Sequence, residues 1–245
     1  MTKNLEYKGR FSEYTDELLR LRHHFHQYPE LALQEKETSS FIQSYMEKLG
    51  YLLVPVSPTG WIAELPRLKD KERCIVLRAE MDALPIEEKT GLPYASKNVG
   101  CMHACGHDAI LASALILARI IAEEKDTFPV SVRFLFEPAE EIGEGAARMI
   151  EAGALDGVDA FLMFHYAGDE LFGMTVHEGQ ASSMIGGMEI HIHGKSSHWC
   201  EAEQGIDAIY GASVAAKAIH ELNREYKGSG KALIGIGSIH GGEYA

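Results

Sequence analysis

Residues 100–108 place two cysteines, two histidines and an aspartate directly ahead of a long apolar segment. Residues 109–122 carry isoleucine and leucine on nearly every side, which predicts a helix that is buried over most of its surface. Polar side chains beside a core cost free energy unless something binds them. The sequence therefore requires a polar site against this helix, and a divalent metal could bind it.

Apolar strands alternate with helices around this segment. We predict strands at residues 51–56, 61–65, 74–79, 130–136 and 160–164, and helices at 13–29, 38–49, 109–122 and 143–152. The regular order of strand, helix and strand after residue 74 predicts an α/β fold with a doubly wound, mostly parallel sheet.

Polar residues that suit metal binding or catalysis follow these strands or precede a helix. They are Asp82, Cys105, His107, Glu140, Glu141 and His165. In open α/β sheets, ligands bind at the carboxyl ends of the strands. The topology therefore predicts that these side chains converge at one edge of the sheet.

The residue types indicate metal-assisted hydrolysis. Cys105 and His107 alone are equally compatible with a metal pair and with a reduced cysteine beside a capping histidine. Adjacent Glu140 and Glu141 point in different directions, so one carboxylate can bind metal while the other accepts a proton from water, although a solvated turn is the simpler alternative. Thiolate, imidazole and carboxylate together suit zinc or a similar ion. Asp108 is expected to cap the buried helix.

Composition narrows the possible partners and location. Lys and Arg number 23 against 36 Asp and Glu, a net charge of −13 that repels nucleic acid and anionic membranes. The N-terminal sequence shows no signal peptide, and no stretch of about 20 apolar residues follows, so we expect a soluble, cytoplasmic protein. Clustered cysteine and histidine in such a protein favour metal binding or catalysis over disulfides.

The pattern changes near residue 184. Residues 188–194 alternate apolar and polar side chains, residues 206–222 form an amphipathic helical pattern, and residues 233–239 again resemble a strand. We therefore expect a catalytic domain over residues 1–183 and part of a second, α+β domain over residues 184–245.

Three segments together resemble a known family. Residues 78–86 (RAEMDALPI), 102–108 (MHACGHD) and 137–141 (EPAEE) closely resemble metallo-amidohydrolases of the aminoacylase/carboxypeptidase group. This group includes hippurate hydrolase, N-acyl-amino-acid amidohydrolases and auxin-conjugate hydrolases. The resemblance implies a zinc-exopeptidase-like catalytic domain, an inserted lid and dimerisation domain, and hydrolysis of N-acyl amino acids by a homodimer.

The resemblance also assigns roles. It implies two divalent ions, zinc, manganese, nickel or cobalt, held by Cys105, His107, Glu141 and His165. Glu140 matches the general base, and Asp82 matches the acidic residue that orients the metal site. His198 matches a lid histidine that reaches a partner subunit's active site and steadies the oxyanion.

Several features depart from the family pattern. Glu137 stands where glutamine is common, Glu80 where aspartate is common, and Trp199 where a small residue follows the lid histidine. Family members continue well beyond Ala245 and supply a further metal-binding histidine, so we expect this chain to be truncated. Two alternatives therefore remain open: a dipeptidase or carboxypeptidase-like enzyme, and a catalytically silent fragment that binds metal or a partner.

Overall fold

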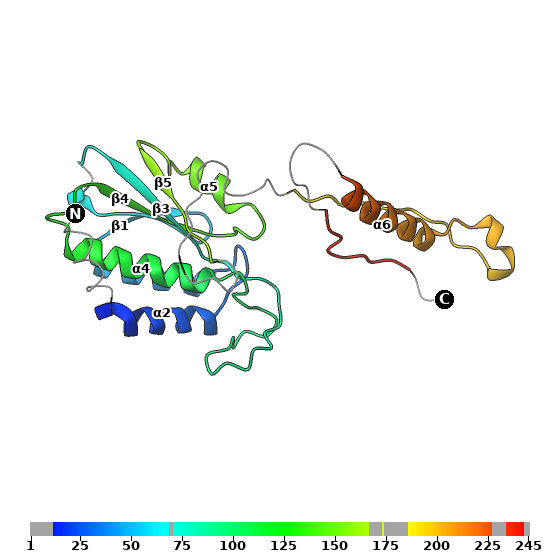
Figure 1. Cartoon of the computed structure of the whole chain (residues 1–245), viewed down its shortest axis with the longest axis horizontal. Coiled ribbons are helices and arrows are strands. Elements are labelled where there is room, and N and C mark those ends of the chain that lie inside the picture. The colour runs from blue at the N-terminus through cyan, green and yellow to red at the C-terminus, as the bar shows by residue number, and fades with distance from the viewer. Residues whose placement is uncertain (1–11, 69–70, 167–172, 174–185, 227–233, 243–245) are drawn as a thin grey trace. The chain divides into compact units, whose positions relative to one another are not determined.

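The chain divides into two compact units, residues 1–171 and residues 172–245 (Figure 1). The computed structural model describes residues 12–68, 71–166, 173, 186–226 and 234–242. The predicted domain boundary between residues 183 and 184 lies outside the described residues and stays a prediction.

The first unit is built on a five-stranded sheet with the order β1-β2-β4-β3-β5. The strands are β1 (Leu52–Val56), β2 (Gly60–Glu64), β3 (Cys74–Glu80), β4 (Ser131–Glu137) and β5 (Ala160–Leu162). β3 pairs in parallel with β4 and β5, whereas β2 pairs antiparallel with both β1 and β4. The α/β class is confirmed, but the sheet is mixed rather than mostly parallel. The short connection between β1 and β2 allows only a hairpin, because parallel pairing needs a crossover of a dozen residues or more.

Helices cover both faces of this sheet, as expected for a doubly wound fold (Figure 1). α2 (Thr15–Gln27), α3 (Lys36–Lys48) and α4 (His107–Glu123) contribute to the larger core on one face, and α5 (Gly145–Glu151) packs on the other. Two short 3-10 helices, η1 (Ser12–Tyr14) and η2 (Pro66–Leu68), complete the described elements of this unit.

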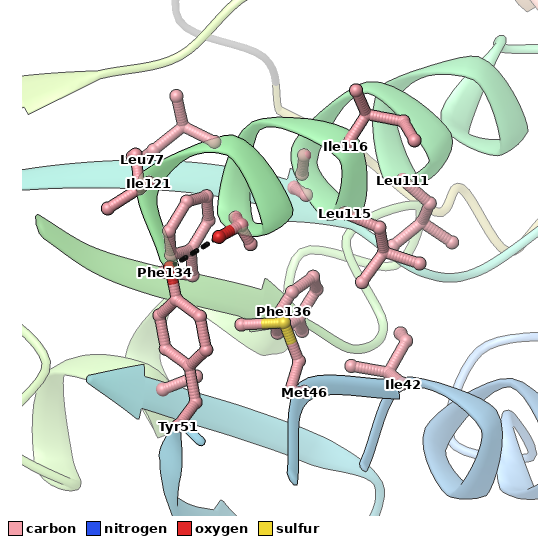
Figure 2. Packing of buried hydrophobic residues seen from close by; sticks show 14 of the residues in the cluster. Ile42, Met46, Tyr51, Leu77, Leu111, Leu115, Ile116, Ile121, Phe134 and Phe136 are labelled. Atoms are coloured by element: carbon pink, nitrogen blue, oxygen red, sulfur yellow. Dashed lines mark hydrogen bonds between the residues drawn. The ribbon is translucent and has the colours of Figure 1, made fainter. Parts of the chain in front are cut away.

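The core fixes α4 against the sheet. Phe134 and Phe136 of β4 are fully buried, and the Tyr51 ring packs edge-on against Phe134 with 5.7 Å between centroids. The Tyr51 hydroxyl donates a 2.9 Å hydrogen bond to the main-chain carbonyl of Ala118 in α4. Figure 2 shows the α4 side chain of Leu115 pointing toward the Phe136 ring, and both belong to the same core cluster. Because interiors pack this densely, the start of α4 is held rigidly at the edge of the sheet.

The second unit contains η3 (Trp199–Gln204) and α6 (Ala208–Glu225), which confirms the predicted amphipathic helix. The predicted strands at 188–194 and 233–239 are not strands where the structure describes them; residue 233 lies outside the described residues. Lys195 and Ile206 form an isolated antiparallel bridge. Alternation alone does not make a strand, because an extended segment also needs neighbours that accept its backbone hydrogen bonds.

No described helix is long and apolar enough to cross a membrane.

Candidate metal and catalytic site

The polar residues predicted from the sequence meet at the carboxyl ends of the parallel strands. β3 ends two residues before Asp82, β4 ends three residues before Glu140, and β5 ends three residues before His165. α4 begins at His107, directly after Gly106, whose φ of 88° lies in the left-handed region that glycine adopts readily. Parallel strands bring these segments together because their carboxyl ends share one edge of the sheet.

His107 lies at the centre of the site. Its Nδ1 donates a 2.9 Å hydrogen bond to the main-chain carbonyl of Asp82, which leaves Nε2 as the acceptor nitrogen. Nε2 is buried and has no hydrogen-bond partner among the described residues. It lies 3.8 Å from Glu140 Oε2 and 4.0 Å from Glu141 Oε1. An unpartnered buried nitrogen facing two carboxylates is costly without a ligand.

Two overlapping groups of donors surround His107. Cys105, His107 and His165 form one group, and His107, Glu140 and Glu141 form the other; within each group, the ligand atoms lie within 4.8 Å of one another. Cys105 Sγ is 3.3 Å from His165 Nε2. The structure therefore brings together all four predicted ligands and the predicted base.

The donor set fits divalent transition metals. Thiolate, imidazole and carboxylate are the ligands of zinc and similar ions. Besides His107 Nε2, the buried oxygens Glu141 Oε1 and Asp82 Oδ1 lack hydrogen-bond partners in the described part of the chain. Unsatisfied atoms of this kind at one place are what a metal ion would satisfy, and each candidate's role as a ligand stays a prediction.

The electrostatics agree with a site built for cations. Burial and the nearby Glu141 carboxylate raise the pKa of Cys105 to about 11. Burial also raises the pKa of Glu141 and of Asp82. A bound cation would favour the ionised form of each group, because a metal is the largest local charge at such a site.

Asp82 orients two of the candidate ligands. Its Oδ2 accepts a 2.9 Å hydrogen bond from the backbone N–H of Glu141, and its main-chain carbonyl accepts the hydrogen bond from His107. The side chain is fully buried. These contacts support the predicted orienting role, since partners of this kind fix the direction of metal ligands.

Sequence reasoning missed a buried ionic network beneath Glu140. Arg78 of β3 donates hydrogen bonds to Glu80 and Glu137, and its Nη2 lies 3.8 Å from Glu140 Oε1. The positive charge of the guanidinium thus partly compensates the negative charges of the Glu80, Glu137 and Glu140 carboxylates. A basic residue within an otherwise apolar strand was the available signal. Glu80 and Glu137, the two departures from the family pattern, are both buried partners of this one arginine.

Asp108 does not cap α4 as expected. The N-cap position belongs to Gly106, and Asp108 lies in the first turn with its side chain buried. Its Oδ2 accepts hydrogen bonds from Arg22 Nε at 2.9 Å and from His26 Nδ1 at 2.8 Å. The glycine conformation starts the helix earlier, so Asp108 faces α2 instead of the helix end.

His198 lies in the second unit. It is exposed, occupies the N-cap position of η3, and its Nδ1 accepts a 3.2 Å hydrogen bond from the backbone N–H of Cys200. The other candidate residues belong to the first unit, and the action of His198 on the oxyanion stays a prediction.

Comparison with known proteins identifies the family. Residues 76–232 match the profile of Peptidase family M20/M25/M40. The chain belongs to this family. Its relatives include N-acetyl-L-cysteine deacetylase of Bacillus subtilis (strain 168), 40% identical over 229 residues that cover 92% of this chain and 55% of the relative. The N-acyl-L-amino acid amidohydrolase of Geobacillus stearothermophilus is 36% identical over 234 residues, covering 91% of this chain and 61% of the relative.

A solved structure supports the same assignment. The YXEP protein of Bacillus subtilis, described as a dinuclear metal-binding peptidase from the M20 family, matches with a TM-score of 0.61 and 40% sequence identity. The match covers 64% of this chain and 45% of that protein. The matches to these three relatives therefore cover between 45% and 61% of the relative's own length.

Proposed function

We propose that this M20 protein hydrolyses the amide bond of N-acyl amino acids or related small amides with the help of two divalent metal ions. The observation that carries the proposal is the pair of donor groups that share His107, with Glu140 beside its unpartnered Nε2. The names of the relatives in Bacillus subtilis and Geobacillus stearothermophilus support this substrate class.

Cys105, His107, Glu141 and His165 would hold the ions, which we expect to be zinc, manganese, nickel or cobalt. When bound, such ions lower the pKa of water and polarise a carbonyl. The Glu140 carboxylate takes a proton from the attacking water as the water oxygen bonds to the amide carbon. It then delivers that proton to the leaving nitrogen as the C–N bond breaks, which yields a carboxylic acid and a free amino acid.

The wider assembly also belongs to the proposal. We infer a homodimer formed through the second unit, in which His198 donates to the oxyanion at the partner subunit's site. A cytoplasmic location rests on the four cysteines, all of which are free.

A substrate panel tests the proposal. The metal-loaded protein is assayed against N-acetyl and N-benzoyl amino acids and against dipeptides. Preference for the acyl amino acids is expected, and preference for dipeptides would favour a peptidase instead. Metal binding without turnover of any substrate would contradict hydrolysis and favour a metal-binding or partner-binding role.

Replacement of the proposed base gives the sharpest test of the mechanism. Glu140→Gln keeps the shape of the side chain but removes its basicity, so kcat should fall by about 10²- to 10⁴-fold. Metal content, measured by mass spectrometry of the native protein, should stay unchanged. The exposed Glu151→Gln on α5 is the matched control and should retain full kcat. An unchanged kcat in Glu140→Gln would show that another group is the base.

A further inference from the structure

The turn that carries Glu140 and Glu141 contains an unusual backbone conformation. Ala139 has a φ of 55°, and Leu33, with a φ of 64°, is its only non-glycine companion with positive φ in the described ranges. A residue with a Cβ adopts this region at a cost in free energy, and it stays there only where its surroundings hold it. The conformation of Ala139 sets the direction in which the next residue, Glu140, leaves the turn.

Glu35 holds Ala139 from a distant part of the chain. It is the N-cap residue of α3, and it is fully buried. Its Oε1 accepts a 2.8 Å hydrogen bond from the Ala139 backbone N–H, and its Oε2 accepts a 2.7 Å hydrogen bond from Thr59 Oγ1. Both carboxylate oxygens therefore accept a hydrogen bond, and one of the two donors belongs to the turn.

The carbonyl of Ala139 is held within the turn itself. The carbonyl of Ala139 accepts hydrogen bonds from the N–H groups of Glu144 at 3.2 Å and Gly145 at 3.3 Å. A Cβ added at Gly145 would lie 1.8 Å from the carbonyl oxygen of Pro138, so this close approach requires glycine. With its carbonyl satisfied inside the turn, Ala139 needs an outside partner only for its N–H.

Glu35 and Asp82 each accept a hydrogen bond from a different backbone N–H group of the turn. Asp82 accepts from the backbone N–H of Glu141, and Glu35 accepts from the N–H of Ala139, two residues earlier. Glu140 lies between these two fixed points. Burial raises the pKa of Glu35, and the hydrogen bonds from the Thr59 hydroxyl and the Ala139 N–H oppose this rise.

We propose that Glu35 is a positioning residue that holds Ala139 in the left-handed conformation and so directs the Glu140 carboxylate into the site. The proposal rests on the function proposed above, because that function gives Glu140 its catalytic role. Glu35 itself is buried and acts through the turn.

Substitutions at Glu35 test this role. Glu35→Ala removes the partner of the Ala139 N–H, and kcat should fall by about 10²-fold, the size expected when a catalytic group is misplaced by about 1 Å. KM should change little. Glu35→Gln should retain most of kcat, because its amide oxygen can accept from Ala139 and its amide NH₂ can donate to the Thr59 hydroxyl.

A second substitution in the turn separates positioning from general stability. Glycine adopts positive φ without the Cβ cost, so Ala139→Gly combined with Glu35→Ala should recover part of the lost kcat. Glu30→Ala is the matched control. The Glu30 carboxylate accepts from the N–H groups of Glu37 at 3.1 Å and Thr38 at 2.8 Å at the start of the same helix, but it has no hydrogen bond to the turn. This control should lose stability and keep kcat.

Amide hydrogen exchange gives a readout that does not depend on activity. In the metal-free protein, the Ala139 amide should exchange faster in Glu35→Ala than in wild type, and it should stay protected in Glu35→Gln and Glu30→Ala. If wild type hydrolyses no substrate, the proposed function fails, yet this measurement still decides the role of Glu35. Should Glu35→Ala not fold, Glu35→Asp replaces it, since the shorter side chain cannot reach both Thr59 and Ala139.

Three results would overturn the proposal: unchanged protection of the Ala139 amide in Glu35→Ala, equal losses of kcat in Glu35→Ala and Glu30→Ala, or no recovery of kcat when Ala139→Gly is added to Glu35→Ala.

Discussion

Helix α4 of the first unit and helix α6 of the second have 17 and 18 residues, yet α4 buries most of its apolar side chains and α6 buries none of its residues. Both sequences carry enough leucine, isoleucine and valine to pack. The difference lies in what each helix meets: α4 lies on a sheet, and α6 lies in a unit whose predicted strands are unpaired in the described residues. Apolar patterning therefore determines which face of a helix can be buried, and a second layer of structure is needed to bury that face.

The same contrast separates the functional residues. In the first unit, side chains from distant segments converge around His107 with buried, oriented partners. In the second unit, His198 is exposed, and within the described part of the chain its ring accepts a hydrogen bond only from its own turn. A site in the first unit is thus assembled by packing within one chain, whereas the proposed role of His198 depends on assembly.

Matched leucine substitutions should show the largest difference between the two units. Leu115→Ala in α4 removes a fully buried side chain and should lower the free energy of unfolding by about 2–5 kcal/mol. Leu222→Ala in α6 removes a side chain that is 53% exposed and should change it by less than about 0.5 kcal/mol. Urea unfolding with size-exclusion chromatography measures both. A large cost for Leu222→Ala, with loss of a dimer, would show that assembly covers α6.

Removal of His198 should affect catalysis and leave the first unit intact. His198→Ala should lower kcat by about 10²- to 10³-fold, as expected for loss of one oxyanion donor. Metal affinity should not change. His193→Ala, at another exposed position of the second unit, is the control and should keep wild-type kcat. Wild-type kcat in His198→Ala would confine the active site to the first unit.

Asp82 tests the orientation of ligands within the first unit. Asp82→Asn keeps the shape of the side chain but removes its charge next to the Glu141 N–H, so metal affinity should fall by about 10- to 100-fold. Isothermal titration with zinc measures this loss. Asp159→Asn is a matched control, because Asp159 accepts a hydrogen bond from the backbone N–H of Cys74 at the opposite end of β3. Equal affinities in the two variants would contradict an orienting role for Asp82.

The smallest effect should come from titration of His26, which removes no side chain. The hydrogen bond to Asp108 raises the pKa of His26 against the effect of burial, and Glu88 lies 3.2 Å from its other nitrogen. The folded state therefore holds the proton more tightly than the unfolded chain, whose histidine pKa is about 6.5. This stability is fully present below about pH 6.5 and is lost as pH rises through the pKa of folded His26.

Unfolding free energies measured from pH 5 to 8 would show this decline, and His26→Asn should flatten it. His220→Asn, on the exposed surface of α6, should show the same dependence of the unfolding free energy on pH as wild type. A profile that His26→Asn does not alter would assign the pH dependence to other groups.

In the first unit, local sequence patterns were sufficient to predict the main helices and strands and the convergence of the candidate ligands. Continuous apolar runs predicted β3, β4 and α4, because a segment that is apolar on all sides has to be buried. The position of polar residues after those strands predicted that Cys105, His107 and Glu141 would meet, because parallel strands place their carboxyl ends together.

Contacts between distant segments could not be predicted in this way. Asp108 looked like a cap, and only the approach of α2 shows that it pairs with Arg22 and His26. No partner for Arg78 was evident from the sequence, and the structure shows that β4 places Glu137 beside it.

The sequence by itself determined the helices and strands of the first unit and which donors follow its parallel strands, because those properties depend on hydrophobic patterning and on neighbours along the chain. The tertiary structure decided how the donors are oriented. Glu35 and Ala139 are 104 positions apart, and the hydrogen bond that joins them depends on α3 packing beside the sheet. The sequence gives the chemical type of each side chain directly, whereas its hydrogen-bond partner depends on which distant segments the fold brings beside it.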